Sequence, residues 1–163
     1  MKFILVVIAL LLPTVSYPLG EAGDIEWPKG ATIEVQLKLS AADTNSHLKV
    51  FGDLLIRNSG DTALTIQSPN NRLVLAFLVF DALGNLVVPK GLAKVEPAFR
   101  IQILSARSTY THHFESLDFI TGSGLRGYEL SHGRSYKILA VYRPAGPRGP
   151  GFTSQEINLD IPK

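Results

Sequence analysis

The stretch "GYELSHGRSYKILAVYRP", from Gly127 to Pro144, decides the fold because its second half alternates without a fault. Tyr136, Ile138, Ala140 and Tyr142 fall on one side of an extended chain, with Lys137, Leu139 and Val141 on the other. A period of two is the mark of a β-strand with one buried face. The stretch therefore predicts a strand that enters the core of a β protein.

The residues just before this strand have the spacing of a tyrosine corner. Leu130, Gly133 and Tyr136 form an L-x-x-G-x-x-Y pattern. In Greek-key sandwiches a tyrosine at this place sends its hydroxyl to the backbone a few residues upstream and fixes the connection between sheets. We predict that role for Tyr136.

Ser131 and His132 offer a competing interpretation, as a catalytic pair. Neighbours in an extended segment point to opposite sides, so the two side chains cannot exchange a proton without a special turn. The chain also lacks the G-x-S-x-G pattern of a nucleophile elbow. We expect no enzymatic activity and no catalytic residue.

Outward from this strand, the chain reads as a series of short strands separated by turn residues. No segment has a helical period, and turn signals recur about every eight to twelve residues. This pattern predicts an antiparallel, immunoglobulin-like Greek-key sandwich of about seven to nine strands, in one domain over residues 25–163. The expected strands are 31–39, 47–58, 62–67, 73–80, 86–88, 99–104, 109–114, 135–142 and 153–161.

Three of these strands carry more specific predictions. The eight apolar residues of Leu73–Phe80 suggest a central strand buried on both faces. Ile101 and Ile103, together with Phe99, are expected to face the core. Gly52 interrupts an alternating strand, which indicates a bulge or a close backbone contact.

The N-terminus "MKFILVVIALLLPTVSYPLG" has the layout of a secretory signal peptide. Lys2 precedes an apolar run over Phe3–Leu12, which is about half the length of a membrane-spanning helix. We expect residues 1–22 to hold the signal and the start of a linker, with cleavage after Ser16 or Ala22. The mature protein would then be secreted or periplasmic, without stable membrane insertion; an uncleaved anchor is the alternative.

Composition narrows the possible partners. The 163 residues include no cysteine and carry a formal net charge of +2, with the two signs intermixed along the chain. Nothing forms a basic stripe that could follow a phosphate backbone, which argues against nucleic acid as a partner. We expect a monomer that has no cofactor and binds a protein partner.

The loop that follows the alternating strand, "YRPAGPRGPGF", is the predicted binding surface. Three prolines stiffen it, and a preordered loop loses little entropy on binding, while tyrosine and arginine are typical of interface hot spots. The alternatives are a plain hairpin connection, or a secreted protease inhibitor that presents residues 143–151 with Arg148 entering a specificity pocket. The candidate binding residues are Tyr142, Arg143, Pro144, Pro147, Arg148 and Phe152.

Two adjacent histidines, His112 and His113, raise the possibility of a metal carrier or a small hydrolase. Adjacent strand residues face opposite ways, so one site could use only one of them. We therefore expect one histidine packed inside, one solvated, and no metal site.

Four segments of the chain resemble the bacterial intracellular proteinase inhibitor (BsuPI-type) domain and its immunoglobulin-like relatives. They are "LLIRNSGDTALTI", "LAFLVFDALGNLV", "FRIQILSARSTYTHHF" and "GRSYKILAVYRP", within Lys49–Arg143. The resemblance implies the sandwich fold and, more remotely, protease inhibition. Two departures are the missing tryptophan-rich segment, since Trp27 is the only tryptophan, and the export signal. The matching positions are Asn58, Asp81, Gly84, Tyr110, Phe114, Gly133 and Tyr136.

Taken together, these features predict an exported, non-catalytic β-sandwich that works as a protein-binding or structural accessory module.

Overall fold

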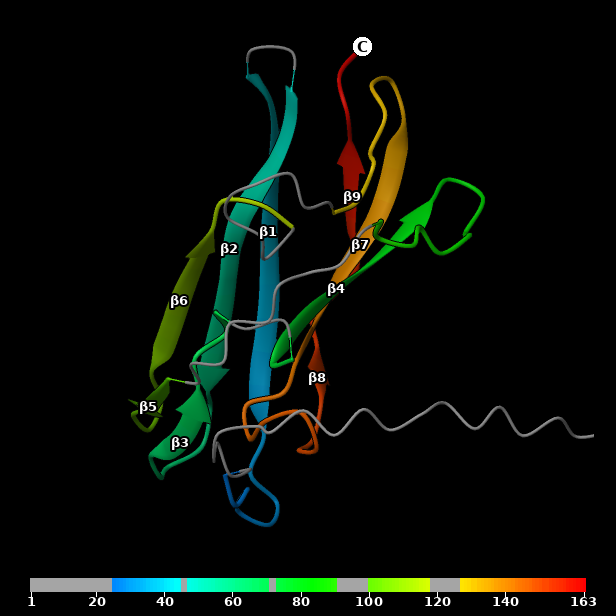
Figure 1. Ribbon diagram of the computed structural model, residues 1–163. Coiled ribbons are helices and arrows are strands. Elements are labelled where there is room, and N and C mark those ends of the chain that lie inside the picture. Colours follow the sequence, from blue (N-terminus) through cyan, green and yellow to red (C-terminus); the bar gives the residue numbers. More distant parts are fainter. Residues whose placement is uncertain (1–24, 45–46, 71–72, 91–99, 118–126) are drawn as a thin grey trace, which may run out of the picture.

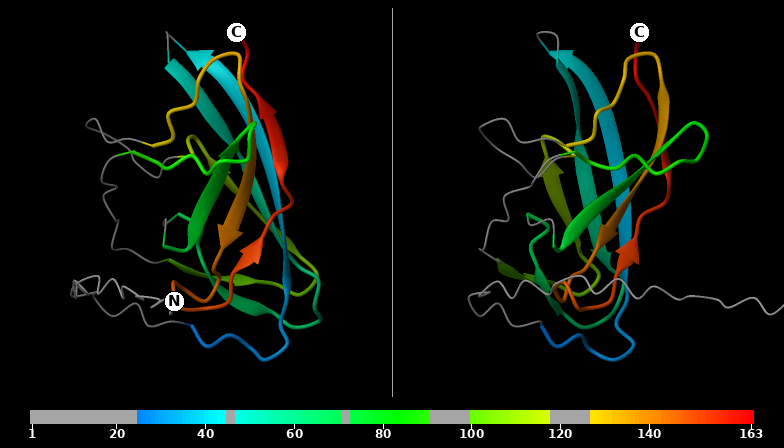
Figure 2. Two further views of the ribbon diagram at one scale, coloured as in Figure 1. Left: turned by 90° about the vertical axis from the view of Figure 1, so that its right-hand side faces the viewer. Right: turned by 45° about the vertical axis from the view of Figure 1, so that its right-hand side comes forward.

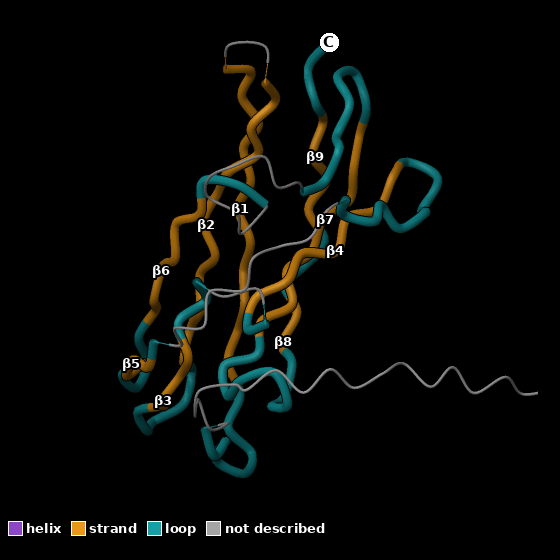
Figure 3. Tube along the Cα trace, in the orientation of Figure 1, coloured by secondary structure: helices purple, strands orange, loops and turns teal. Residues whose placement is uncertain are grey.

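A computed structural model describes residues 25–44, 47–70, 73–90, 100–117 and 127–163. These residues form nine strands and no helix, so the predicted all-β class is confirmed (Figures 1 and 3). None of them belongs to a helix that could cross a membrane. The predicted signal peptide lies outside the described residues. The strands are β1 (Ile33–Thr44), β2 (His47–Asn58), β3 (Leu64–Gln67), β4 (Leu75–Asp81), β5 (Ile101–Leu104), β6 (Thr109–Phe114), β7 (Ser135–Tyr142), β8 (Phe152–Thr153) and β9 (Ile157–Asp160).

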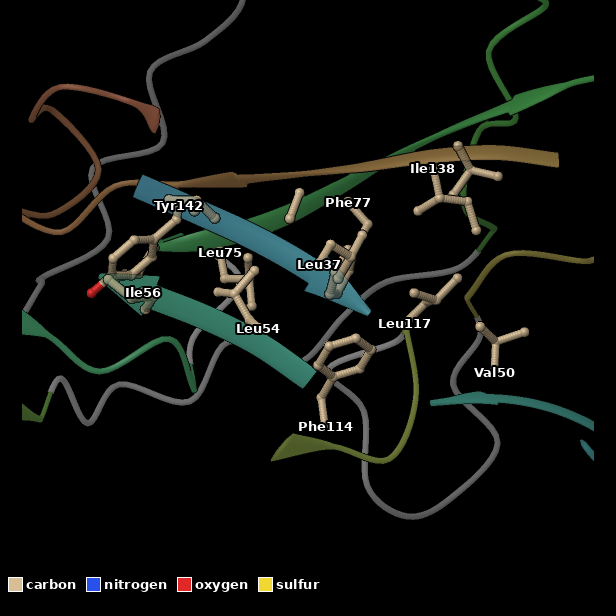
Figure 4. Packing of buried hydrophobic residues seen from close by; sticks show 14 of the residues in the cluster. Leu37, Val50, Leu54, Ile56, Leu75, Phe77, Phe114, Leu117, Ile138 and Tyr142 are labelled. Carbon is tan, nitrogen blue, oxygen red and sulfur yellow. The ribbon is translucent and has the colours of Figure 1, made fainter. Parts of the chain in front are cut away.

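The strands pair antiparallel in three sheets. One sheet has the order β1-β2-β6, and a second has β7 at its centre with β4 on one side and both β8 and β9 on the other. The small third sheet pairs β3 with β5. Figures 1 and 2 show the first two sheets as facing layers, and Figure 4 shows side chains from both layers meeting between them.

The first sheet is built on a long hairpin of β1 and β2. Ile33, Val35 and Leu37 are buried along β1, as their alternation predicts. At Gly52 of β2 the backbone comes so close to β1 that an added Cβ would lie 1.9 Å from the Lys38 carbonyl oxygen. The pairing stays in register there, so Gly52 marks a close contact and not a bulge.

The second sheet contains β7, the alternating strand that the sequence predicts before Pro144. Tyr136, Ile138, Ala140 and Tyr142 of β7 are all buried, as predicted, and face the first sheet. Burying such a row of side chains contributes about 1.5–3 kcal/mol for each large apolar residue, which makes β7 the centre of the core.

The predicted last strand, residues 153–161, is split into β8 and β9 by a bulge. Between the pairs Ile138–Ile157 and Val141–Thr153, β7 contributes two residues and its neighbour three. Ser154 fills the gap: its N–H donates to the Ala140 carbonyl and its Oγ accepts from the Ala140 N–H, both at 2.9 Å. The side chain thus replaces a missing backbone acceptor.

Two predictions about strand faces are wrong. β4 lies at the edge of its sheet and not at the centre, and Leu78 on its outer side is exposed. On β5, Ile101 and Ile103 face solvent while Leu104 is buried. β5 is aligned by its pairing with β3, and a shift of one residue in strand register exchanges the inner and outer faces.

Asn58 ties the turn after β2 to the turn before β6. Its side chain is buried; its Nδ2 donates to the carbonyls of Thr62, Leu104 and Ser105, and its Oδ1 accepts from the Gly60 N–H. The sequence predicted a tight turn here, but only two of these four partners, Gly60 and Thr62, come from the turn itself, and the other two are more than 40 positions away. Asn58 therefore joins the first sheet to the third.

Candidate functional site

The predicted tyrosine corner has its three residues around one turn. The Tyr136 hydroxyl is buried at the start of β7 and accepts a hydrogen bond of 2.9 Å from the backbone N–H of Ser131, five residues upstream. Gly133 has φ +69°, a conformation that favours glycine, and its N–H donates to the Ile161 and Pro162 carbonyls. Leu130 packs against the core. These contacts hold the turn to the C-terminal strand and give it a structural role.

The predicted binding loop is partly inside the protein. Tyr142 is fully buried, and its hydroxyl donates to the Gln67 carbonyl at 2.5 Å; burial raises the pKa of this phenol. Pro144 is also fully buried, and its carbonyl accepts from the Gln67 N–H. These two residues cannot belong to an exposed binding surface, which corrects that part of the prediction. They attach the end of β7 to β3.

The outer part of the loop, beyond its buried base, is folded into two consecutive tight turns. In the first turn the Gly146 N–H donates to the carbonyl of Arg143, which is half-buried. In the second turn the Gly149 N–H donates to the Gly146 carbonyl, so Pro147 and Arg148 are the two central residues of that turn. Both are exposed. Arg148 therefore sits in a turn and not in the extended segment that a protease cleft would bind.

Phe152, the last of the candidate binding residues, packs against Trp27. The two ring centroids are 5.6 Å apart, and both rings are half-buried. Phe152 thus closes the N-terminal side of the core and offers little free surface.

The two histidines of β6 lie on opposite faces. His112 is half-buried; burial lowers its pKa, and the neighbouring His113 lowers it further. His113 is exposed, with Nδ1 3.0 Å from the Asp53 Oδ1 on β2. Within the described ranges, no three His, Cys, Asp or Glu side chains gather as a metal site would require.

A shallow groove of about 840 Å³ runs between β1 and the β8–β9 side of the second sheet. It is lined by Ile33–Lys38 and Gly151–Ser154, together with Gln155 and Ile157. Cα atoms of β1 lie within 8 Å of Cα atoms in β8 and β9. A strand inserted between two others needs about 9.5 Å, twice the usual spacing, so a peptide cannot lie along the groove as an added strand.

The most distinctive surface lies on the outer side of the second sheet. Four of the six large apolar side chains that are exposed in the described residues are Leu78, Leu83, Leu86 and Val88, on β4 and its hairpin return. Phe80 and Leu86 form a bridged pair, and Leu78 lies opposite Leu139 of β7. We call the outward-facing apolar residues of this sheet the β4 face: Leu78, Phe80, Leu86, Val88, Leu139 and Val141.

The hairpin that carries Leu86 and Val88 of the β4 face is held by Asp81. Its Oδ1 accepts from the N–H groups of Leu83 and Asn85, and its Oδ2 accepts from the Asn85 side chain. The side-chain hydrogen bond from Asn85 is the main reason that the pKa of Asp81 lies below its ordinary value. Gly84 takes φ +83° in the same turn. The turn therefore presents Leu83 and Leu86 in a fixed geometry.

The β4 face was not predicted from the sequence, although the sequence contains a signal for it. In the run Leu73–Phe80 every residue is apolar, so the side chains on both faces of the strand are apolar. This pattern predicts a central strand that is buried on both faces. The outward-facing residues of β4 remain exposed because no described segment covers that face of the sheet. An apolar outer face can equally well indicate an interface.

A scan of the sequence against protein-family models finds no match, and neither does a search of curated proteins. The resemblance to BsuPI-type domains therefore stays a prediction.

Proposed function

We propose that this chain is an exported, non-catalytic protein of immunoglobulin-like Greek-key type that acts by binding another polypeptide through the β4 face. The observation that carries the proposal is the concentration of exposed large apolar side chains on β4 and its hairpin. Soluble proteins rarely leave a contiguous apolar patch on their surface unless it contacts something. Secretion or a periplasmic location fits the apolar N-terminal segment.

The rigidity of the surface supports this function. β4 is paired to β7 over its full length, and the Asp81 contacts fix the hairpin. A preordered surface loses little conformational entropy when a partner binds. The β4 face is thus better suited to binding than the 143–151 loop, whose base is in the core.

Partner capture from the envelope fraction of the exporting organism tests the proposal. The comparison is between the natural chain, the double variant Leu86→Lys with Val88→Lys, and the double control Ile101→Lys with Ile103→Lys, which places the same two charges at exposed positions on β5. We expect specific capture to be lost only in the variant of Leu86 and Val88. Equal capture by all three chains would show that the β4 face is not the binding surface.

Protease inhibition through Arg148 is the competing proposal, supported by the resemblance to the BsuPI-type domain and by the exposure of this side chain. The tight turn around Arg148 does not favour it. Inhibition of a trypsin-like enzyme that disappears in Arg148→Ala would establish it.

A further inference from the structure

The outer edges of the three sheets differ in how they are covered. β1, at one edge of the first sheet, lies against β8 and β9. The edge of β4 is occupied where the Val79 carbonyl accepts from the Val87 N–H. The edge of β3 is occupied where the Gln67 N–H donates to the Pro144 carbonyl. β6, at the other edge of the first sheet, has no such cover among the described residues.

β6 presents a regular row of backbone groups on its uncovered side. It pairs with β2 over its whole length, Thr109–Phe114, so alternate residues direct their N–H and C=O groups away from β2. No other segment that the structure describes forms a hydrogen bond to these groups. We call this row the β6 edge; Figure 1 shows it on the far side of β2 from β1. Such a row is a template for one further strand.

The sequence of β6 has none of the features that usually protect an edge strand. Natural sheets block their edges with lysine, proline, glycine bulges or inward charges. The six residues "TYTHHF" include no proline, glycine, lysine, arginine or acidic residue. Threonine, tyrosine and phenylalanine instead favour extended pairing. The β6 edge is therefore open to an added strand both in its backbone and in its side chains.

The side chains along this edge indicate what kind of strand fits. Tyr110 and His112 lie on the inner face of β6 and are only half-buried, so alternate side chains of an added strand would cover them. Figure 1 shows β5 continuing beyond the end of β6. On β5, Ile101 is 64% exposed and Ile103 75% exposed. Apolar or β-branched side chains suit both strands, and neither strand carries a charge that would attract a charged segment.

We propose that the β6 edge binds an extended, uncharged segment of another polypeptide, which joins the first sheet as a further strand beside β6. Backbone hydrogen bonds would supply the affinity, and the alternate side chains over Tyr110 and His112 the selectivity. This site lies on the first sheet, whereas the β4 face lies on the second. The inference therefore stands independently of the proposed function.

Amide hydrogen exchange followed by NMR tests the proposal. The probe is a synthetic peptide of alternating threonine and valine, with lysines at both ends for solubility. In the free protein, the amides of β6 should alternate between slow and fast exchange, because only every second N–H is bonded to β2. The peptide should slow the fast amides about ten-fold or more once it occupies most of the protein. The Gln67 amide, which is bonded to Pro144, should not change.

Two N-methylated forms of the probe provide the control for the backbone contact. In each form, every second residue of the peptide carries an N-methyl group, and the two forms differ in which set is methylated. Only the form that loses the N–H groups facing β6 should fail to bind, since the other set points away from the sheet. Equal binding by both forms would overturn the proposal, because the contact would not use a backbone ladder.

A pair of threonine variants tests the position of the contact. Thr111→Lys places a cation beside the incoming, lysine-flanked strand and should raise the dissociation constant of the probe about three-fold or more. Thr153→Lys makes the same change at an exposed position on β8 and should leave the constant unchanged. Since both positions are exposed, both variants should keep the thermal unfolding midpoint of the natural chain.

The remaining outcomes decide against the proposal. A probe that slows no amide of β6 at any soluble concentration would overturn it, as would equal dissociation constants for the two threonine variants. Protection of the β6 edge that rises with protein concentration, without any peptide, would assign the edge to a second copy of this chain and overturn the choice of a separate partner.

Discussion

The two ends of β7 carry two buried tyrosines on the same face, yet they are fixed in opposite ways. Tyr136 accepts a hydrogen bond from Ser131, five residues away, whereas Tyr142 donates one to Gln67, 75 residues away. The first contact closes a local turn, and the second attaches β7 to β3. Two tyrosines on the same buried face of one strand therefore stabilise the fold through contacts of very different sequence separation.

The same contrast holds elsewhere in the molecule. The Asn58 side chain joins turns that are more than 40 residues apart, while the Asp81 side chain accepts hydrogen bonds from Leu83 and Asn85, two and four positions away. Long-range contacts of this kind constrain how distant segments pack. Their loss should therefore lower the free energy of unfolding more than the loss of a local contact does. The following predictions test that ranking, from the largest effect to the smallest.

Asn58→Ala should have the largest effect, lowering the free energy of unfolding by about 2–4 kcal/mol. The substitution removes every side-chain hydrogen bond at this corner and leaves the buried Leu104 carbonyl without its donor. Urea unfolding followed by circular dichroism measures the change. Asn158→Ala, at an exposed position of β9, is the matched control and should be nearly silent. Equal effects of the two variants would contradict a joining role for Asn58.

Tyr142→Phe should lower the free energy of unfolding by about 1–3 kcal/mol, because the Gln67 carbonyl stays buried and loses its donor. The same urea titration measures it. Tyr110→Phe is the control, since its hydroxyl makes no hydrogen bond to the described residues. If Tyr142→Phe were no more destabilising than Tyr110→Phe, the contact with β3 would contribute nothing to stability.

Tyr136→Phe should lower the free energy of unfolding by about 1 kcal/mol and leave any binding activity of the folded protein intact. The effect is smaller than at Tyr142 because the Ser131 N–H lies near the surface, where water can replace the lost acceptor. Differential scanning calorimetry together with the capture assay measures both properties. A thermally silent substitution would argue against a tyrosine corner and weaken the proposed Greek-key topology.

The Asp81 hairpin should show the smallest effect, visible as a local response to pH. Because the folded-state pKa of Asp81 lies below its ordinary value, its contribution to stability is complete above about pH 4 and is lost as the pH falls through the folded-state pKa. Amide resonances of Leu83 and Asn85 should therefore shift in that acidic range. In Asp81→Asn these shifts should vanish; their persistence would assign the response to another group.

Some of this architecture could be predicted from the sequence, and the reason is local. The alternation of β1, β2 and β7 is set by the two-residue period of a strand, and the turn around Gly133 and Tyr136 is closed within a few residues. The opposite orientations of His112 and His113 follow from the same rule. None of these features requires knowing which strand lies next to which.

Other features depended on the neighbours of each strand. Ile101 and Ile103 face outward because the pairing of β5 with β3 sets their register, and Leu78 is exposed because no described segment covers the outer face of the second sheet. The burial of Tyr142 depends on β3 meeting the end of β7.

The all-β class, most of the strands and the local turns follow from residue spacing and backbone preference, so they can be derived from the sequence alone. Which apolar face is covered depends on contacts between segments far apart in the chain, so it becomes visible only in the folded structure. The β4 face is the clearest example: its residues are as apolar as the core, and they remain outside because no described segment lies over them.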